Sequence, residues 1–567
     1  MCGIFAYLGN YRPIDNSLKD SFNKIKNRGP DGSSLVCINE DKKSGNNCHS
    51  DSDSFNNNCE GSNYNSHVIF GFHRLAVIDL SDSANQPMTV GGNSIVCNGE
   101  IFNYKKLIAN NDFKCKTNSD CEVVLHMFNK YGIEKTVSSL DAEFAFVLYD
   151  AKKGVVYVAR DPFGVRPLFI GYDDEFNYYI CSEIKGLVDL CTKITRFRPG
   201  CYWSSKTYDY VRYYNYSYPI GKDYMSLKDN TLDEICSGLK EKLVTAVRKR
   251  LMSDRPVGCL LSGGLDSSLI TSIVAKEFKS QNKGVLNTFS IGMEGSTDLY
   301  YAKKVADYIG SKHHHIELTP TDFLRAIPEV IYNIESYDTT TVRASVGNYL
   351  VAKYIKENTD ITVVYNGDGS DEQSGYLYLR NAPDADEFQE ECVSLLKNIH
   401  MFDCLRSDRS VSSRWSLESR TPFLDKDFVN YYMSIDPKLK MYGKNDNRIE
   451  KFLLRKAFEE GDYLPKEVLW RRKEAFSDGC SSVKNSWHSI ITEFVNEIIS
   501  DEDYEFQRKK YKTNCPQLKE TLFYRKIYDH YYGYFSNVID FYWLPKWCGN
   551  QIDPSARELD GYEQEQV

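Results

Sequence analysis

The sequence lacks long apolar runs and any compact arrangement of cysteines. Its longest apolar runs, such as Val257–Leu261 and Phe144–Tyr149, fall far short of the ~20 residues that cross a bilayer. The chain does not open with a basic segment followed by an apolar one, so we expect no signal peptide and no membrane partner. The 17 cysteines are scattered without a CxxC pair. This excludes a small disulfide scaffold and favours a reducing, cytoplasmic compartment.

The overall composition is that of an ordinary globular protein. The 567 residues are 41% hydrophobic and 26% charged, with 17 prolines and 35 glycines. These values exclude a collagen, a coiled-coil rod and a largely disordered chain. The formal net charge of −9 argues against broad nucleic-acid binding. We therefore expect a soluble protein of several domains with no nucleic-acid partner.

The first 200 residues predict one α+β domain, over residues 2–205. Short apolar runs alternate there with turn residues, and two helical patterns interrupt them. Residues 39–66 differ, because Asn, Ser, Asp and Gly dominate them. We predict that this polar insertion is disordered. Cys48, His49 and Cys59 lie inside it, but their spacing matches no zinc finger, so a solvated loop is favoured over a metal site.

The second half predicts an α/β domain over residues 225–545. Strand patterns at Val257–Leu261, Leu286–Ile291 and Ile361–Tyr365 alternate with helical ones, which is typical of a parallel sheet. Beyond residue 380 the patterns are mostly helical. Residues 553–567 are polar and acidic, and we predict a mobile tail there.

Several residues near the N-terminus could together hydrolyse an amide. Removal of the initiator Met would leave Cys2 first, beside a free α-amine that can act as the base for its own thiol. Cys2 alone is explained equally well by a buried structural role. Arg74 follows a strand and suits capture of a carboxylate. The amide of Asn98 and the backbone N–H of Gly99 could hold an oxyanion, and Asp120 could accept hydrogen bonds from an ammonium group.

Seven motifs in this region carry a specific resemblance. They occur in the order MCGI, RGPDG, HRLAVID, NGEIFNY, SDCE, EFAFVLYD and RDPFGVRPLF. Together they resemble the N-terminal-nucleophile domain of class II glutamine amidotransferases, which has an αββα fold. The resemblance implies that Cys2 attacks the glutamine side chain and forms a thioester, while Asn98 and Gly99 hold the oxyanion. It also implies a set of glutamine-binding residues: Arg74, Leu75, Ala76, Val77, Ile78, Asn98, Gly99, Glu100 and Asp120.

A glycine-rich loop, SGGLDSS, opens the second domain between a predicted strand and a helix. Its glycines let backbone N–H groups approach an anion at the helix N-terminus. The Gly-Lys-Ser/Thr ending of a Walker A loop is missing. The loop resembles the pyrophosphate loop of ATP pyrophosphatases. The alternative is a plain turn in which Asp266 caps the helix.

Further motifs extend the resemblance over about nine-tenths of the chain. TTVRAS, DGSDE, RTPFLD and RRKEAFSDG follow in order. Joined to the first domain, they are similar to glutamine-hydrolysing asparagine synthetases. The resemblance implies that ATP activates aspartate as β-aspartyl-AMP, that pyrophosphate leaves, and that ammonia from glutamine then gives asparagine and AMP. It also implies Mg²⁺ and a homodimer.

The same resemblance implies roles for residues of the second domain. Asp266 and Asp371 would hold Mg²⁺, and Lys473 would neutralise charge on the α-phosphate. Aspartate would be held by Thr340, Thr341 and Arg343, although a structural ion pair explains Arg343 equally well. The implied nucleotide-binding residues are Leu260, Ser262, Gly263, Gly264, Asp266, Ser267, Ile291, Asn366 and Gly367.

One motif departs from the family pattern. Asp368 stands where the family has a glutamate linked to formation of the intermediate, and Asn366 replaces a serine. The aspartate is one methylene shorter, and a shift of about 1 Å in a catalytic group can cost about 10²-fold in rate. The following segment, Gln373–Tyr376, is also one residue shorter than the family's. Our hypothesis is that the loop has shifted so that Asp368 is a catalytic residue that still reaches the reacting atoms.

Two other functions stay open from the sequence. One is a related amide-forming ligase for another carboxylate, as in the β-lactam-forming relatives, but TTVRAS and RRKEAFSDG favour aspartate. The other is a catalytically weak chain kept for binding or assembly, which the intact Cys2 and SGGLDSS oppose. A metal at His313–His315 is not favoured, because neighbouring side chains on a strand point to opposite faces.

Overall fold

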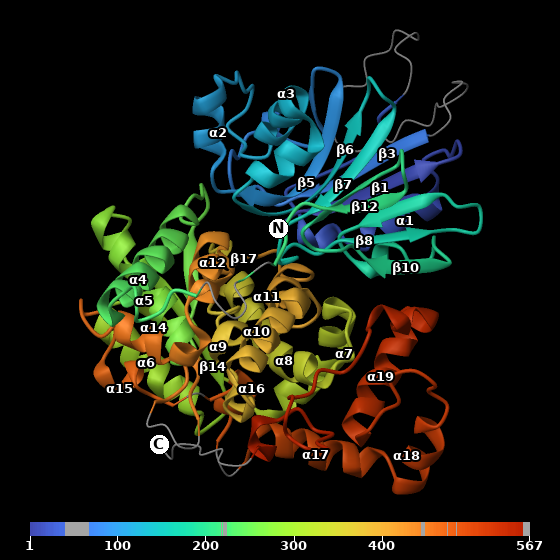
Figure 1. The fold of residues 1–567 in the computed structure, drawn as a ribbon. Coiled ribbons are helices and arrows are strands. Elements are labelled where there is room, and N and C mark those ends of the chain that lie inside the picture. Colours follow the sequence, from blue (N-terminus) through green and yellow to red (C-terminus); the bar gives the residue numbers. More distant parts are fainter. Residues whose placement is uncertain are drawn as a thin grey trace. The chain divides into compact units, whose positions relative to one another are not determined.

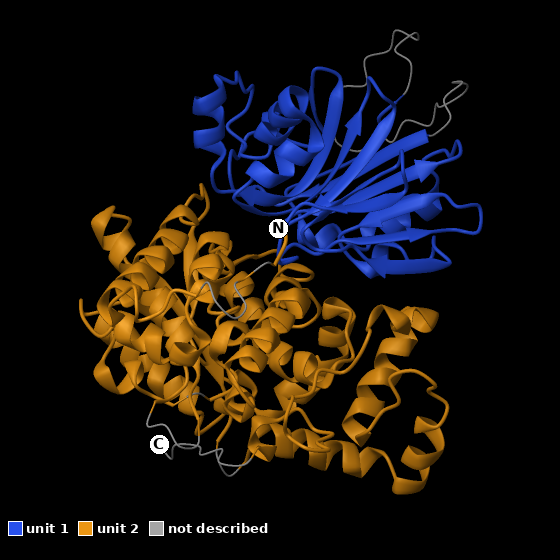
Figure 2. Ribbon diagram, in the orientation of Figure 1, with its two compact units in different colours: residues 1–214 blue, residues 215–567 orange. Residues whose placement is uncertain are grey.

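The computed structural model describes residues 1–39, 67–216, 218, 224–443, 448–472, 474–482 and 485–559. The chain separates into two compact units, residues 1–214 and 215–567 (Figure 2). The predicted insertion lies outside the described residues except for Asn39, and so do its Cys48, His49 and Cys59. Lys473 also lies outside them.

The first unit contains two antiparallel six-stranded sheets (Figure 1). The order in the first sheet is β10-β8-β9-β1-β3-β2, with β1 in its interior. These strands are β1 (Gly3–Gly9), β2 (Gly32–Cys37), β3 (His67–Arg74), β8 (Phe169–Tyr172), β9 (Tyr178–Cys181) and β10 (Lys193–Arg196). The order in the second sheet is β12-β11-β7-β6-β5-β4. Its strands are β4 (Met88–Val90), β5 (Asn93–Ile101), β6 (Ala142–Asp150), β7 (Val155–Arg160), β11 (Cys201–Ser204) and β12 (Asp209–Arg212).

The two sheets pack face to face between helices. In β1, Ile4, Ala6 and Leu8 point into the core between the sheets. Phe5 points the other way, against Phe22 of helix α1 (Asn16–Asn23), because successive side chains of a strand alternate faces. Helices α2 (Tyr104–Asn111) and α3 (Glu122–Ser139) lie on the outer face of the second sheet, and α3 covers it. The unit is therefore layered helix, sheet, sheet, helix.

The second unit is built on a five-stranded parallel sheet, as the alternating patterns predicted. The order is β15-β14-β13-β16-β17, and each neighbouring pair is parallel. The strands are β13 (Val257–Leu260), β14 (Asn287–Gly292), β15 (Lys312–Glu317), β16 (Val363–Tyr365) and β17 (Glu418–Arg420). The sequence patterns predicted the central three. The edge strands contain no apolar run, because β15 is polar and β17 consists of Glu418, Ser419 and Arg420; of the two, only the strand at His313–His315, within β15, was expected.

The strand order creates a crevice at the carboxyl ends of the central strands. From β13 the chain passes through α5 (Leu265–Ser280) to β14 on one side, whereas β16 lies on the other side. Such a reversal leaves room for a ligand beyond the strand ends. Helices surround the sheet: α4 (Leu232–Lys249), α6 (Thr297–Ile309), α7 (Pro320–Ile334), α8 (Thr339–Asn358), α9 (Asp371–Ser374), α10 (Ala385–Asn398), α11 (Asp403–Ser412), α12 (Lys426–Ser434), α13 (Pro437–Lys440), α14 (Phe452–Ala457), α15 (Lys466–Leu469), α16 (Phe476–Gly479), α17 (Trp487–Ile498), α18 (Asp501–Arg508) and α19 (Lys519–Tyr532).

The described start of the C-terminal tail is anchored. The carboxylate of Asp553 pairs with Arg343 and His488. A short 3₁₀ turn, Ala556–Glu558, follows it, and Arg557 contacts Asp478. The prediction of a mobile tail is therefore wrong for residues 553–559, because the buried Arg343 needs the negative charge that this segment supplies.

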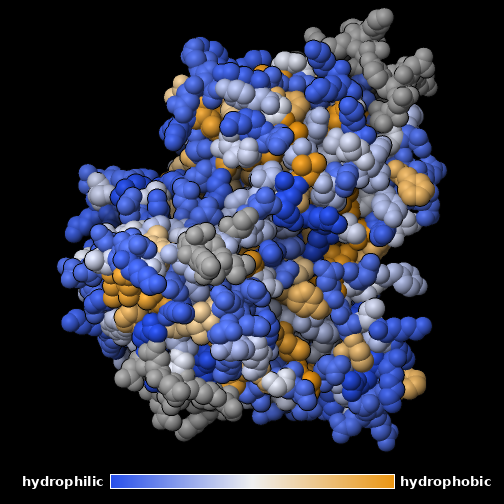
Figure 3. All heavy atoms as spheres, viewed as in Figure 1, coloured by the Kyte–Doolittle hydropathy of each residue, from blue (hydrophilic) through white to orange (hydrophobic). Residues whose placement is uncertain are grey.

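Hydrophilic side chains dominate the face of the protein shown in Figure 3. Across the described part of the chain, every helix is too short or too polar to cross a bilayer.

Candidate active sites

The thiol of Cys2 is held at the start of β1 by backbone and amide groups. The backbone N of Cys2 donates to Oδ1 of Asn98 at 2.9 Å, and Arg28 Nε donates to the Cys2 carbonyl at 2.9 Å. The backbone N–H of Leu75 points at the sulfur, with N and Sγ 3.4 Å apart. The thiol can in turn donate to the Leu75 carbonyl, with Sγ and O 3.7 Å apart.

Arg28 of the RGPDG motif is a structural support for the nucleophile. Its guanidinium is fully buried and pairs with Glu183 at 2.7 Å, and Lys185 pairs with the same carboxylate at 2.6 Å. Removing one partner from such a buried group costs about 3–5 kcal/mol. Arg28 therefore fixes the position of the Cys2 backbone through a rigid ion-pair network.

Asn98 offers a buried donor that the described protein leaves unused. Its Oδ1 binds Cys2, but its Nδ2 has no hydrogen-bond partner among the described residues. Buried donors are almost always paired, so this one is available to a ligand oxygen. Gly99 follows in β5, where a Cβ atom would lie 2.5 Å from the Glu143 carbonyl. The close approach of β6 leaves room only for glycine there.

Arg74 and Asp120 are tied together through Asp79. Arg74 is buried and donates to the Asp79 carbonyl. The Asp79 carboxylate accepts from the backbone N of Asn118 at 2.8 Å, two residues before Asp120. Asp120 in turn accepts from the backbone N of Ile101 at 2.6 Å. A cation and a carboxylate that could hold the α-carboxylate and the α-ammonium group of an amino acid are thus fixed in one network.

The remaining predicted glutamine-binding residues lie in the same part of the first unit. The Ala76 backbone N donates to Asp31 of the RGPDG motif at 2.9 Å, which holds the segment that follows Arg74. Most of these side chains are buried, and Ile78 is half-buried: Leu75, Ala76, Val77, Ile78 and Glu100. The RGPDG and HRLAVID motifs therefore contact each other through this hydrogen bond.

The SGGLDSS loop forms an anion cradle in the second unit. Gly263 has φ of +75°, and a Cβ there would lie 2.4 Å from the backbone N of Ala302. Ser262 Oγ and Ser267 Oγ are 2.9 Å apart and close the loop. No side chain caps the first turn of α5, so its N–H groups are available to a phosphate.

A cavity of about 210 Å³ opens over this cradle, at the carboxyl ends of β13, β14 and β16. It brings together most of the residues that the resemblance implied: Leu260, Ser262, Gly264, Asp266, Ser267, Ile291, Thr340, Asn366, Gly367, Asp368 and Asp371. Gly263, Thr341 and Arg343 do not line it. Gly263 instead packs against the backbone of Ala302 and so sets the shape of the loop.

Arg343 makes a structural ion-pair network. Its buried guanidinium donates to Glu520 at 2.8 Å and to Asp553 at 2.8 Å. Glu520 and Asp553 are far away in the sequence, so their approach could not be foreseen. The prediction that Arg343 holds aspartate is not supported by this arrangement, and the alternative of an ion pair is what the structure contains.

The two neighbouring threonines have different surroundings. Thr341 donates to Asp338 at 2.7 Å and so completes the N-terminal cap of α8. The prediction that Thr341 binds substrate therefore lacks support. Thr340 lines the cavity, and its buried Oγ1 has no hydrogen-bond partner in the described part of the chain. Thr340 thus keeps a polar group available to a ligand.

Lys451 is a cavity residue that the sequence patterns missed. Its Nζ lies 2.5 Å from Asp266 Oδ2 and 2.6 Å from Asp371 Oδ1. The side chain is 2% exposed, and its backbone is left-handed, with φ of +58°. A lysine adopts that conformation only where its surroundings hold it. This positive φ has no signature in a sequence, and Lys451 stood in no motif.

Carboxylates and one arginine crowd the far side of the cavity. Asp368 pairs with Arg406, and burial raises the pKa of Asp368 to about 6, although Arg406 opposes this. Its Oδ2 has no hydrogen-bond partner among the described residues. The Tyr376 hydroxyl lies 3.1 Å from Glu372 and 3.2 Å from Asp403. Burial and the neighbouring Asp403 raise the pKa of Glu372 as well.

Comparison with known proteins shows the family of the chain. A family model described as asparagine synthase matches residues 238–384 and 374–534, and one described as a glutamine amidotransferase domain matches residues 48–199. The glutamine-hydrolysing asparagine synthetase of Cricetulus griseus is 41% identical over 99% of both chains. Those of Homo sapiens and Gallus gallus are 40% identical over the same shares. The chain belongs to the family of glutamine-hydrolysing asparagine synthetases.

The likeness to solved amidotransferase structures is much weaker. Glutamine phosphoribosylpyrophosphate amidotransferase from B. subtilis is 17% identical, with a TM-score of 0.30, over 56% of this chain and 81% of that one. A TM-score this low supports no argument about the fold. The architecture of this member of the asparagine synthetase family is therefore described from its own strand order and hydrophobic cores.

Proposed function

We propose that this chain makes asparagine from aspartate, with ATP as the activating substrate and glutamine as the source of ammonia. The observation that carries this proposal is that one chain holds two complete constellations. The first is a thiol beside an unused buried amide donor, and the second is an anion cradle facing carboxylates and a lysine. A glutaminase alone would need only the first, and a plain nucleotide-binding protein only the second.

The first unit would act as an N-terminal-nucleophile glutaminase. When Met1 is removed, the nitrogen that lies 2.9 Å from Asn98 Oδ1 becomes the α-amine of Cys2. This amine takes the thiol proton, and the sulfur attacks the amide carbon of glutamine. Asn98 Nδ2 and the Gly99 N–H hold the oxyanion. The amine then protonates the leaving ammonia, and water hydrolyses the thioester to glutamate.

The glutamine would be held by its two charged groups, which are both attached to Cα. Arg74 would bind the α-carboxylate, and Asp120 with Glu100 would bind the α-ammonium group. The Asp79 bridge between Arg74 and Asn118 supports this assignment, because it fixes the spacing of the two charges. A longer or shorter amide substrate would keep both contacts but would place its amide carbon out of line with the Cys2 sulfur.

In the second unit, ATP would lie with its phosphates on the SGGLDSS loop. The β-carboxylate of aspartate attacks the α-phosphorus, pyrophosphate leaves, and β-aspartyl-AMP forms. Ammonia then attacks the acyl carbon, and AMP leaves. Lys451 would neutralise the phosphate charge from its place between Asp266 and Asp371. Lys473 is proposed to share this task, and Thr340 is proposed to contact aspartate.

The donor set at the loop fits Mg²⁺. Asp266 and Asp371 converge on one point, now filled by the ammonium group of Lys451, and carboxylate oxygens are the ligands that hard cations prefer. Bound Mg²⁺ would offset the negative charge of the phosphate oxygens. For Asp266 and Asp371 to hold Mg²⁺, the Lys451 ammonium group would have to leave this point for the phosphate oxygens.

Asp368 would take the proton that the attacking ammonia loses. Its pKa of about 6 is close to neutrality, as general base catalysis requires. Arg406 orients one carboxylate oxygen and leaves Oδ2 for the reacting atoms. This arrangement supports the hypothesis that the loop compensates for the shorter side chain.

A product assay tests the proposal. The purified chain, with removal of Met1 confirmed by mass, is mixed with glutamine, aspartate, ATP and Mg²⁺, and asparagine, AMP and glutamate are quantified. Near-equal asparagine and AMP are expected. Glutamate without AMP would show a live glutaminase beside a second site that is impaired or uses another carboxylate. No turnover of either substrate would favour a role in binding or assembly.

A further inference from the structure

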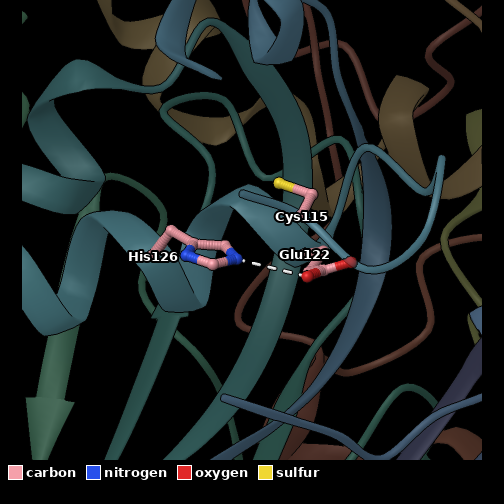
Figure 4. Close-up of side chains that lie close together, drawn as sticks. All are labelled: Cys115, Glu122 and His126. Carbon is pink, nitrogen blue, oxygen red and sulfur yellow. Dashed lines mark hydrogen bonds and ion pairs between the residues drawn. The ribbon is translucent and has the colours of Figure 1, made fainter. Parts of the chain in front are cut away.

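A cysteine, a glutamate and a histidine lie together in the first unit, outside the glutaminase site (Figure 4). They are Cys115, Glu122 and His126, and one ligand atom from each lies within 4.8 Å of the others. Glu122 and His126 are four residues apart on helix α3, so they share one face of it. Cys115 comes from the loop before the helix.

The distance between the two helix residues suits a common ion, and the Cys115 sulfur, within 4.8 Å of both ligand atoms, would move closer to complete the site. His126 Nε2 and Glu122 Oε1 are 3.2 Å apart, close to the separation of two atoms that each lie about 2.0–2.2 Å from one tetrahedral metal. Figure 4 shows the imidazole and the carboxylate turned toward each other, with the thiol of Cys115 on the same side of both. We propose that Cys115, Glu122 and His126 bind a divalent transition-metal ion of the zinc type, with solvent as the remaining ligand.

The surroundings hold two of these side chains in place. Glu122 Oε1 accepts from the Lys116 backbone N at 2.8 Å, and Oε2 accepts from Thr117 N and Oγ1 at 2.8 and 2.7 Å. Hydrogen bonds of this kind orient a carboxylate for a metal and leave lone pairs for it. The His126 ring stacks on Phe113, with centroids 5.3 Å apart. The site is therefore preorganised on the side of the helix.

The chemistry of the set selects the ion. A thiolate with an imidazole favours zinc, cobalt or copper over magnesium or calcium. Cys115 and His126 are half-buried, so solvent and an ion can reach them. On binding, the thiol of Cys115 releases its proton to solvent and forms one metal–sulfur bond, with no change of oxidation state. The ion would join the loop of residues 115–118 to helix α3.

Cobalt is the probe for this site, because Co²⁺ bound to a thiolate gives a sulfur-to-metal charge-transfer band. The full-length chain is stripped with a chelator and titrated with Co²⁺ and then with Zn²⁺. We expect a thiolate band that saturates with one equivalent of Co²⁺ at this site, apart from any Co²⁺ held by the carboxylates of Asp266 and Asp371, and we expect the band to be lost as Zn²⁺ replaces Co²⁺. Cys115→Ser should abolish the band, and His126→Gln should weaken binding by at least about tenfold.

Cys548→Ser is the matched control, because Cys548 is also half-buried but lies in the second unit. It should keep both the band and the affinity. Glutamate release is measured for Cys115→Ser as well, and normal release would show that this variant is folded. Zn²⁺ should also raise the unfolding temperature of the unsubstituted chain but not that of Cys115→Ser. A missing band, or one that survives in Cys115→Ser, would overturn the proposal.

Discussion

Lengthening Asp368 should damage the synthetase rather than repair it. The family has glutamate at this position, so a simple reading expects Asp368→Glu to improve turnover. In the structure, however, the aspartate already pairs with Arg406 and lines the cavity with Oδ2. The extra methylene would move the carboxylate by about 1.5 Å. Since the Arg406 side chain is only 15% exposed, the longer side chain must break the ion pair or enter the space of the substrate.

The expected loss follows from that displacement. A shift of about 1 Å in a reacting group can cost about 10²-fold in rate, so asparagine formation by Asp368→Glu should fall by about 10²-fold. The assay follows asparagine and AMP with ammonia or glutamine as donor, and glutamate release as an internal check that stays unchanged. Asp386→Glu, on the exposed side of α10, is the matched control. Faster asparagine synthesis by Asp368→Glu would refute the reasoning and show an impaired site.

Four further predictions concern other residues of the two sites. Asn98→Ala should lower glutaminase kcat by about 10²–10³-fold through loss of the oxyanion donor, while ammonia-dependent synthesis persists; a loss of both activities would argue against that role. Lys451→Met should abolish AMP formation and spare glutamate release, and normal AMP formation would contradict a phosphate contact. Arg343→Met should destabilise the fold by about 3–5 kcal/mol in denaturant unfolding, with the KM for aspartate unchanged in the variant; a raised KM would restore its substrate role. The pKa of Asp368 is raised to about 6, so the folded chain binds this proton more tightly than the unfolded chain does, and the free energy of unfolding should fall as pH rises from about 4 to 6. Asp368→Asn should remove that slope from the pH profile of unfolding. An unchanged slope would contradict the raised pKa.

Much of the fold could be predicted because its signals are local. The continuous apolar run of β1, which is buried on both faces, and the alternation of strand and helix patterns after Val257 reflect which parts of each element are buried. The SGGLDSS loop was recognisable because glycine is needed where the backbone must approach an anion. The edge strand β17 consists of Glu418, Ser419 and Arg420, so no apolar run marks it as a strand.

The candidate sites were predictable to the extent that their residues stand in motifs. Cys2, Asn98 and Asp266 each belong to one, and the structure gives each the surroundings that its proposed chemistry needs. Lys451 belongs to none, since its role depends on two carboxylates from other segments. Arg343 does stand in a motif, and yet its partners place it in an ion pair.

The sequence by itself determined the family, the two-part organisation and the residue types that the chemistry requires, because these depend on local order along the chain. Only the tertiary structure decided which charges meet. Lys451 reaches Asp266 across 185 positions, and Arg343 reaches Asp553 across 210. The energy of a buried charge depends on the partners that packing brings within a few ångströms, and those partners have no fixed spacing in the sequence.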